Sequence, residues 1–193
     1  MNNSIQYSFK WESYTIEVHL DPYRSINPRQ DYDHLGVISY WHRRHAIGED
    51  RNGLRLRETL HPELDYLPDW PPTAEEMEDS GLFYLPVYIY EHGGIALSTR
   101  PFNCRWDGGQ LGWIWSKDPE ATKKILEAEV KEFGDWISGR VYGYVVKDPD
   151  GEEVNSCWGF IGEPEESGLI EEAKMQVEFD IENKKTTCIG EGI

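Results

Sequence analysis

The sequence contains little cysteine and no long apolar run. Its three cysteines, Cys104, Cys157 and Cys188, are far apart and odd in number, which favours reduced thiols over a disulfide-stabilised scaffold. No apolar stretch approaches the roughly 20 residues that a membrane-spanning helix needs, and the first residues lack the basic and then apolar layout of a signal peptide. We therefore expect a cytoplasmic protein that does not bind a membrane.

Familiar catalytic and metal-binding motifs are also missing. There is no Cys-x-x-Cys pair, and His42 with His45 has no second pair of ligating residues at short spacing, so no metal site is predicted. The chain has no P-loop, no Gly-x-Gly-x-x-Gly and no Gly-x-Ser-x-Gly, which excludes the common nucleotide-binding and hydrolase signatures. A thiol nucleophile would need a base such as His92 beside Cys104, and no cysteine-hydrolase signature surrounds that thiol. We expect no cofactor and favour a non-enzymatic protein, while an enzyme stays open.

Acidic side chains, in contrast, are abundant. The chain holds 36 Asp and Glu against 19 Lys and Arg, which gives a net charge of −17. Residues 1–60 are balanced, with eight of each sign, whereas residues 116–193 hold nineteen acidic and nine basic side chains. A field of this sign repels nucleic acid and anionic membranes and attracts basic surfaces. The competing explanation is that the charge only keeps the protein soluble.

The stretch from Tyr84 to Trp115 is the part around which the rest of the chain is organised. It contains three apolar runs rich in Tyr, Val, Ile and Trp, separated by two breaks that contain glycine, and such runs are typical of β-strands. Residues 5–11 and 14–20 predict an N-terminal hairpin, because apolar and polar side chains alternate in the second run. Residues 141–146 and 154–160 predict another hairpin around the turn Asp148–Gly151.

Two amphipathic helices complete the predicted fold. The first begins at Asp118 and Pro119, and Leu126, Val130, Phe133 and Ile137 give it one apolar face. The second covers residues 163–178. From residue 177 to residue 181 apolar and polar side chains alternate instead, which predicts that a last strand follows the helix. We therefore predict one α+β domain over residues 1–193, with a mostly antiparallel sheet of about six to eight strands. Prolines between about residues 61 and 80 predict a surface excursion, in which Thr73 can cap a short helix together with Glu76.

The second glycine-containing break is the best candidate for a ligand site. Within six residues, 105–110, it contains the cation of an arginine, the ring of a tryptophan, the carboxylate of an aspartate and the amide of a glutamine. Loops at the end of a sheet commonly bind ligands. The alternative is a structural turn in which Asp107 caps backbone N–H groups and Gly108–Gly109 adopts positive φ. The residues predicted to line such a pocket are His92, Arg105, Trp106, Asp107, Gln110 and Trp158.

The basic patch Trp41–His45 has two interpretations of its own. Its arginines match phosphate and carboxylate geometry, so it can contact an anionic ligand. Because the chain is so acidic, the patch can equally serve as an internal partner for the protein's own carboxylates, and we favour this second interpretation.

Several motifs in one order give the chain a resemblance to known sequences. They are Asn27–Arg29, Asp33–Gly36, Trp41–Arg44, Tyr88–Ile95, Cys104–Gly112, Val141–Tyr144 and Ser156–Phe160. With these motifs the chain resembles a family of uncharacterised proteins from phages, plasmids and their bacterial hosts. The resemblance implies a context and no catalytic residue. Small acidic proteins of mobile elements are often antagonists of host defence, and some imitate DNA.

Two functions follow from these expectations. The first is an acidic, non-enzymatic binding protein that inhibits a host defence or nucleic-acid-binding factor, presenting carboxylates to its basic surface as a DNA mimic does. It would not bind nucleic acid directly. The second function is a domain that binds or cleaves a small nucleotide-like ligand at the 92–110 region. The side chains predicted to form the acidic surface are Glu127, Glu129, Glu132, Asp135, Glu165, Glu166, Glu171 and Glu172.

Overall fold

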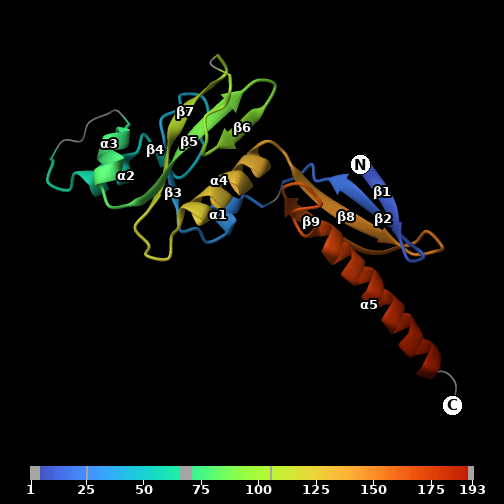
Figure 1. Ribbon diagram of the computed structural model, residues 1–193. Coiled ribbons are helices and arrows are strands. Elements are labelled where there is room, and N and C mark those ends of the chain that lie inside the picture. Colours follow the sequence, from blue (N-terminus) through green and yellow to red (C-terminus); the bar gives the residue numbers. More distant parts are fainter. Residues whose placement is uncertain (1–4, 25, 66–70, 105, 191–193) are drawn as a thin grey trace. The chain divides into compact units, whose positions relative to one another are not determined.

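The computed structural model describes residues 5–24, 26–65, 71–104 and 106–190, and side chains up to residue 185 (Figure 1). The chain divides into two compact units, one made of Met1–Ile26 with Gly139–Ile193 and the other of Asn27–Ser138. Each unit combines at least one helix with a sheet, and the pairings are mostly antiparallel, so the predicted α+β class is confirmed. The described strands form two sheets rather than one. The single domain over residues 1–193 stays a prediction, and each unit is described by itself below.

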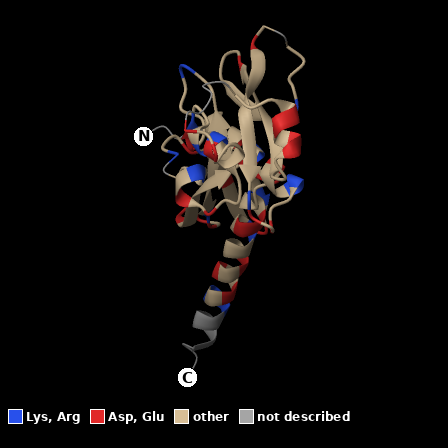
Figure 2. Cartoon of the chain, turned by 90° about the vertical axis from the view of Figure 1, so that its left-hand side faces the viewer, with Lys and Arg blue, Asp and Glu red and all other residues tan. Residues whose placement is uncertain are grey.

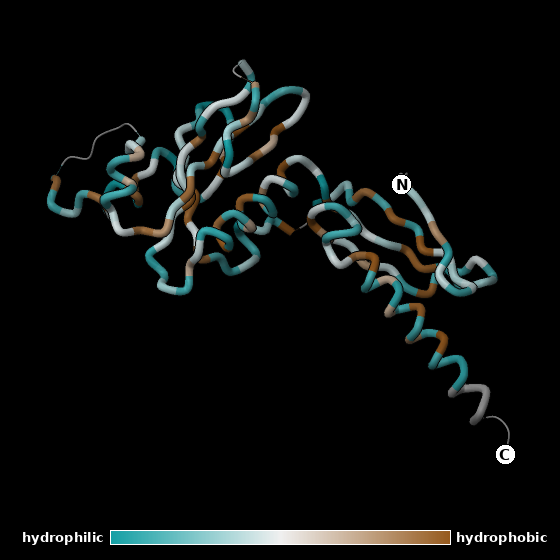
Figure 3. The backbone as a smooth tube through the Cα atoms, in the orientation of Figure 1, coloured by the Kyte–Doolittle hydropathy of each residue, from teal (hydrophilic) through white to brown (hydrophobic). Residues whose placement is uncertain are grey.

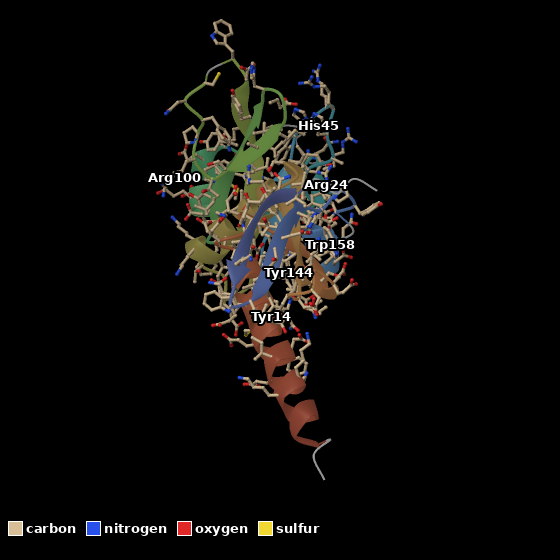
Figure 4. All side chains as sticks on the ribbon, turned by 90° about the vertical axis from the view of Figure 1, so that its right-hand side faces the viewer. Tyr14, Arg24, His45, Arg100, Tyr144 and Trp158 are labelled. Atoms are coloured by element: carbon tan, nitrogen blue, oxygen red, sulfur yellow. The ribbon has the colours of Figure 1, made fainter. Side chains whose placement is uncertain are left out.

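The first unit is a four-stranded antiparallel sheet covered by one long helix. The predicted hairpins are both present, and the strand order is β1-β2-β8-β9. Ile16 pairs with Val146 and Val18 with Tyr144, so these side chains share the face on which the helix packs. Figure 4 shows Tyr14 and Tyr144 on this sheet. The elements are β1 (Ile5–Trp11), β2 (Tyr14–Leu20), β8 (Val141–Lys147), β9 (Glu153–Ile161) and α5 (Leu169–Gly190).

Helix α5 replaces the predicted last strand. It begins after Gly168, whose φ is +83°, and it continues through residues 177–181 to Gly190. The alternation there misled the prediction because Val177 and Ile181, four residues apart, lie on one face of a helix as well as of a strand. Both contact the core, whereas Phe179 between them is exposed. In Figure 3 hydrophobic segments recur turn by turn along α5, as expected for one face of a helix.

The second unit is a five-stranded sheet with helices on both faces. Its strand order is β4-β3-β7-β5-β6, and only β3 and β4 run parallel. On one face Leu126, Val130 and Phe133 of α4 pack against the sheet. On the other face Trp113 and Trp115 of β7 pack against α2 and α3. The elements are α1 (Pro28–Asp31), β3 (Val37–Tyr40), β4 (Asp50–Arg51), α2 (Leu54–Leu60), α3 (Ala74–Asp79), β5 (Phe83–Glu91), β6 (Ile95–Ser98), β7 (Gly108–Ser116) and α4 (Lys123–Ile137).

Several local predictions can be compared with this unit. Helix α4 begins at Lys123 with Thr122 as its N-cap, so the predicted start at Asp118 is wrong. Asp118 instead accepts a hydrogen bond from the Glu120 N–H in a separate turn. The capping box of Thr73 and Glu76 on α3 is confirmed. The excursion over residues 61–80 lies partly outside the described residues, which lack 66–70.

Within the described part of the chain, no helix is both long enough and apolar enough to span a membrane.

Candidate functional site

The predicted ligand loop borders a cavity of about 320 Å³ in the second unit. We call this cavity the Glu91 pocket. Its walls come from the end of β5, from the loop after β3, and from the start of β7. The Glu91 N–H donates to the Asp107 carbonyl at 2.8 Å, and the Trp41 N–H donates to the Leu111 carbonyl at 3.0 Å, so main-chain bonds bring these segments together. The lining residues are His42, Arg44, Ile89, Glu91, Trp106, Asp107, Gly108, Gly109 and Gln110.

Three basic side chains converge on the carboxylate of Glu91. His42 Nε2 lies 3.3 Å from Oε2 and His45 Nε2 lies 3.0 Å from Oε1. Arg44 Nη2 lies 3.2 Å and 3.1 Å from the two oxygens. Burial acts to raise the pKa of Glu91, but Arg44 and the two imidazoles outweigh it and hold this pKa below its ordinary value. The carboxylate is therefore ionised at neutral pH.

The tautomer of the His42 ring follows from its hydrogen bonds. The main-chain N–H of His45 donates to His42 Nδ1 at 3.2 Å, so Nδ1 carries the lone pair and Nε2 carries the hydrogen that points to Glu91. The two rings stack with centroids 5.2 Å apart and planes within 9°. His45 is marked in Figure 4. The basic patch thus finds an internal carboxylate partner through His42, Arg44 and His45, which is the interpretation that the sequence favoured.

Asp107 gathers a second, smaller group of polar side chains. Its Oδ2 lies 3.3 Å from His92 Nδ1 and 3.6 Å from Cys104 Sγ, which points its thiol at the carboxylate. The thiol therefore faces an acid rather than an imidazole, which is not the pairing that a thiol nucleophile needs. Gly108 and Gly109 belong to strand β7, where they pair with Tyr90 and Ile89. The predicted positive φ at these glycines is wrong, since neither has one.

Of the remaining predicted ligand residues, two line the pocket, one lies outside the described residues and one belongs to the other unit. Trp106 is 93% exposed and belongs to the lining of the pocket. The Gln110 Nε2 donates to the Gly112 carbonyl at 3.2 Å, and among the described residues its amide oxygen accepts no hydrogen bond. Arg105 lies outside the described residues. Trp158 lies on β9 of the other unit, with its ring 5.8 Å from that of His19 (Figure 4).

Arg44 is the group best placed to contact a bound molecule. Its side chain is 73% exposed, and among the described residues only its Nη2 has hydrogen-bond partners. The Nε–H and Nη1–H groups are consequently left to bind an anion. In the described part of the chain, no group of three His, Cys, Asp or Glu side chains is arranged to hold a metal ion.

Comparisons with known proteins add no further constraint. No family model, curated protein or solved structure matches the chain.

The four acidic residues of α4 that were predicted to form an exposed surface do not all lie at the surface. Glu129 and Asp135 are buried, so they do not belong to an exposed face. Glu129 accepts hydrogen bonds from Arg29 and from the main chain at Leu35 and Gly36, and Asp135 pairs with Lys131 at 3.1 Å. The other two candidates on this helix also lie near nitrogen-containing side chains: Glu127 is 3.7 Å from Arg100, and Glu132 is 3.7 Å from the His34 ring.

The acidic candidates of the first unit are more exposed. Glu165, Glu166 and Glu171 lie at the surface, and Glu172 is half-buried. Glu165 accepts a hydrogen bond from the Tyr7 hydroxyl at 3.0 Å. Figure 2 shows acidic and basic positions following one another along α5.

Sequence reasoning missed the contribution of His42, Arg44 and Glu91 to the pocket. One signal was available: Glu91 is the only carboxylate between Asp79 and Asp107, and it ends a predicted strand. A lone carboxylate in an apolar stretch needs a basic partner. The densest basic patch in the chain is the obvious source.

Proposed function

We propose that the second unit binds a small nucleotide-like ligand in the Glu91 pocket. The observation that carries this proposal is the arrangement of one exposed indole, one arginine with free donors and one amide around a single cavity. Trp106 offers a face on which a base can stack, which is worth about 1–3 kcal/mol per base. Arg44 offers its fork to a phosphate or carboxylate, and Asp107 and Gln110 offer acceptors to the edge of a base.

The size and electrostatics of the pocket limit what it can do. A volume of about 320 Å³ is at the lower end of the range of ligand pockets, so it suits a ligand the size of one nucleotide. Glu91 is already bound by three basic groups and its pKa is lowered. A carboxylate in that state is a weak general base. Binding is therefore better supported than cleavage.

Thermal unfolding with a panel of mononucleotides tests the proposal. A ligand at one hundred times its dissociation constant adds about 2.7 kcal/mol to the free energy of unfolding, which raises Tm measurably. We expect Arg44→Ala and Trp106→Ala to lose this shift. Arg43→Ala is the matched control, because Arg43 is the exposed neighbour that does not line the pocket. A panel without any shift, or a shift that survives in both pocket variants, would contradict the proposal.

A second function is favoured by the outward face of α5. Glu171, Glu178 and Glu182 are exposed there, at spacings of seven and four residues that place them on one side of the helix. Met175 and Phe179 lie among them and are 55% and 61% exposed. Such a face suits a basic protein surface, as an acidic inhibitor of a host defence or nucleic-acid-binding factor, including a DNA mimic, would require.

A lysine-rich peptide is a suitable probe for that second function. Binding measured by fluorescence anisotropy should weaken steeply as salt increases. Changing Glu171, Glu178 and Glu182 together to Gln should reduce it strongly. The control changes three exposed acids of the other unit, Glu63, Glu75 and Glu78, to Gln and alters the net charge by the same amount. Equal losses in the two triple variants would mean that only net charge matters, which would count against a binding face on α5.

A further inference from the structure

A second concave surface lies beside α4, away from the Glu91 pocket. It has a volume of about 520 Å³ and is formed by the segment after α1 together with one face of α4. We call it the His34 pocket. Ile125 and Ala128 of α4 contribute apolar lining, and Tyr32, Asp33 and Glu132 contribute a ring and two carboxylates. Neither lysine nor arginine lines it among the described residues.

The imidazole of His34 presents an acceptor to this pocket. Its Nδ1 lies 2.9 Å from the Tyr32 carbonyl, and because a carbonyl only accepts, Nδ1 carries the hydrogen. In the neutral ring the lone pair is then on Nε2. The side chain is only 9% exposed, and Nε2 lies 3.7 Å from Glu132 Oε2, which is beyond hydrogen-bond distance. A largely buried acceptor therefore faces the pocket without a donor in the described structure.

The carboxylates of Asp33 and Glu132 in this pocket also accept no hydrogen bond from the described residues. Among the described residues no donor lies within hydrogen-bond distance of the Glu132 carboxylate, since the His34 ring is 3.7 Å away, and Asp33 is exposed. Glu129, which also lines the pocket, differs from them because Arg29 and two main-chain N–H groups already occupy its oxygens. The pocket thus offers three acceptors, on His34, Asp33 and Glu132, and few donors.

We propose that the His34 pocket binds a primary alkylammonium group, such as the end of a lysine side chain. An ammonium group has three N–H donors and no acceptor, which matches His34 Nε2 and the two carboxylates. Its alkyl chain can lie on Ile125 and Ala128. The ring of Tyr32, which is 44% exposed, can contact the cation through its face. This site is separate from the nucleotide-like ligand proposed for the Glu91 pocket.

Nuclear magnetic resonance of the histidine rings in the full chain tests the proposal. The His34 signal is assigned by its loss in His34→Gln and is followed during titration with n-butylammonium and with a capped Gly-Lys-Gly peptide. We expect saturable shifts with the amines and none with n-butanol, which lacks the charge. Glu132→Gln and Asp33→Asn should each weaken binding about tenfold. Glu127→Gln is the matched control, because Glu127 is an acid of the same helix outside the pocket.

The two amine probes separate the sources of the ammonium group. Binding of the peptide alone assigns the pocket to a lysine within a polypeptide, whereas equal binding of both probes assigns it to the amine itself. The proposal is overturned if neither probe moves the His34 signal. It is also overturned if Glu127→Gln weakens binding as much as Glu132→Gln, since that would be a general effect of charge. The dispersion of the remaining signals reports whether each variant is folded.

Discussion

Arg29 and Glu129 form a buried ion pair, with Arg29 Nη1 2.9 Å from Glu129 Oε2. Their side chains are 4% and 10% exposed. The arginine also donates to Glu49 and to the Gly36 carbonyl, and Glu129 accepts from the Gly36 N–H. The pair therefore ties α1, α4 and the segment leading into β3 into one network.

Removing one partner of this pair should destabilise the second unit strongly. Glu129→Ala leaves the Arg29 charge buried without its carboxylate, and such a loss costs about 3–5 kcal/mol. Urea unfolding followed by tryptophan fluorescence measures it. Glu127→Ala, on the same helix but exposed, should stay within about 0.5 kcal/mol of the unchanged protein. If Glu129→Ala lowers the free energy of unfolding as little as Glu127→Ala does, the network contributes little to stability.

A glycine on the central strand β7 provides a second test. A Cβ at Gly112 would lie 2.0 Å from the Ser39 carbonyl oxygen, which belongs to the backbone of the neighbouring strand and cannot move aside alone. Gly112→Ala should cost at least about 1–3 kcal/mol and disturb the pairing of β3 with β7. Gly109→Ala on the same strand meets nothing within 4 Å and should be nearly neutral. Thermal unfolding of both variants compares them directly, and equal Tm values would refute this account of Gly112.

Much of the fold was predictable because one face of each element is buried. Alternation in residues 14–20 and spacing in α4 each report a single buried face, and both predictions are confirmed. The division of the strands into two sheets has no such local signal, because it depends on which distant strands form hydrogen bonds. The short parallel pairing of β3 with β4 is missed for the same reason.

The acidic residues show where local patterns fail. Glu129 was predicted at the surface because it is charged, yet it lies three residues after Leu126 and four before Phe133, so it falls on the apolar face of α4. Its burial depends on Arg29, which is one hundred residues away in the sequence. The Glu91 pocket is similar, since Arg44 reaches Glu91 across 47 residues. The loop itself was predicted, whereas its basic wall was missed although the lone carboxylate of Glu91 in an apolar stretch signalled a basic partner.

The corrected start of α4 can be tested at its N-cap. The Thr122 hydroxyl accepts from the Ile125 N–H at 3.2 Å, so Thr122→Ala should lower the free energy of unfolding by about 1 kcal/mol. Thr122→Ser keeps the acceptor and should retain most of that stability. If Thr122→Ser loses as much as Thr122→Ala, the hydroxyl is not acting as a cap.

The sheet of the first unit should depend on pH through Glu17. The hydrogen bond from Lys147, at 2.7 Å, is the main cause that holds the pKa of Glu17 below its ordinary value, and burial opposes it. A carboxyl whose pKa is lowered by folding stabilises the folded state above its unfolded pKa, near 4.5, and loses that contribution as the pH falls through the folded value. Glu17→Gln should therefore lower stability at pH 7 by about 1 kcal/mol or less.

The comparison of pH 7 with pH 3 isolates this contribution. Between these values Glu17→Gln should lose less stability than the unchanged protein, because it has no carboxyl to protonate at this position. Glu178→Gln, which removes an exposed carboxylate from α5 of the same unit, controls for the change in net charge. Urea unfolding at both pH values gives the free energy of unfolding of each variant relative to the unchanged protein. If Glu17→Gln retains the full pH dependence of the unchanged chain, the bond between Lys147 and Glu17 does not stabilise the sheet.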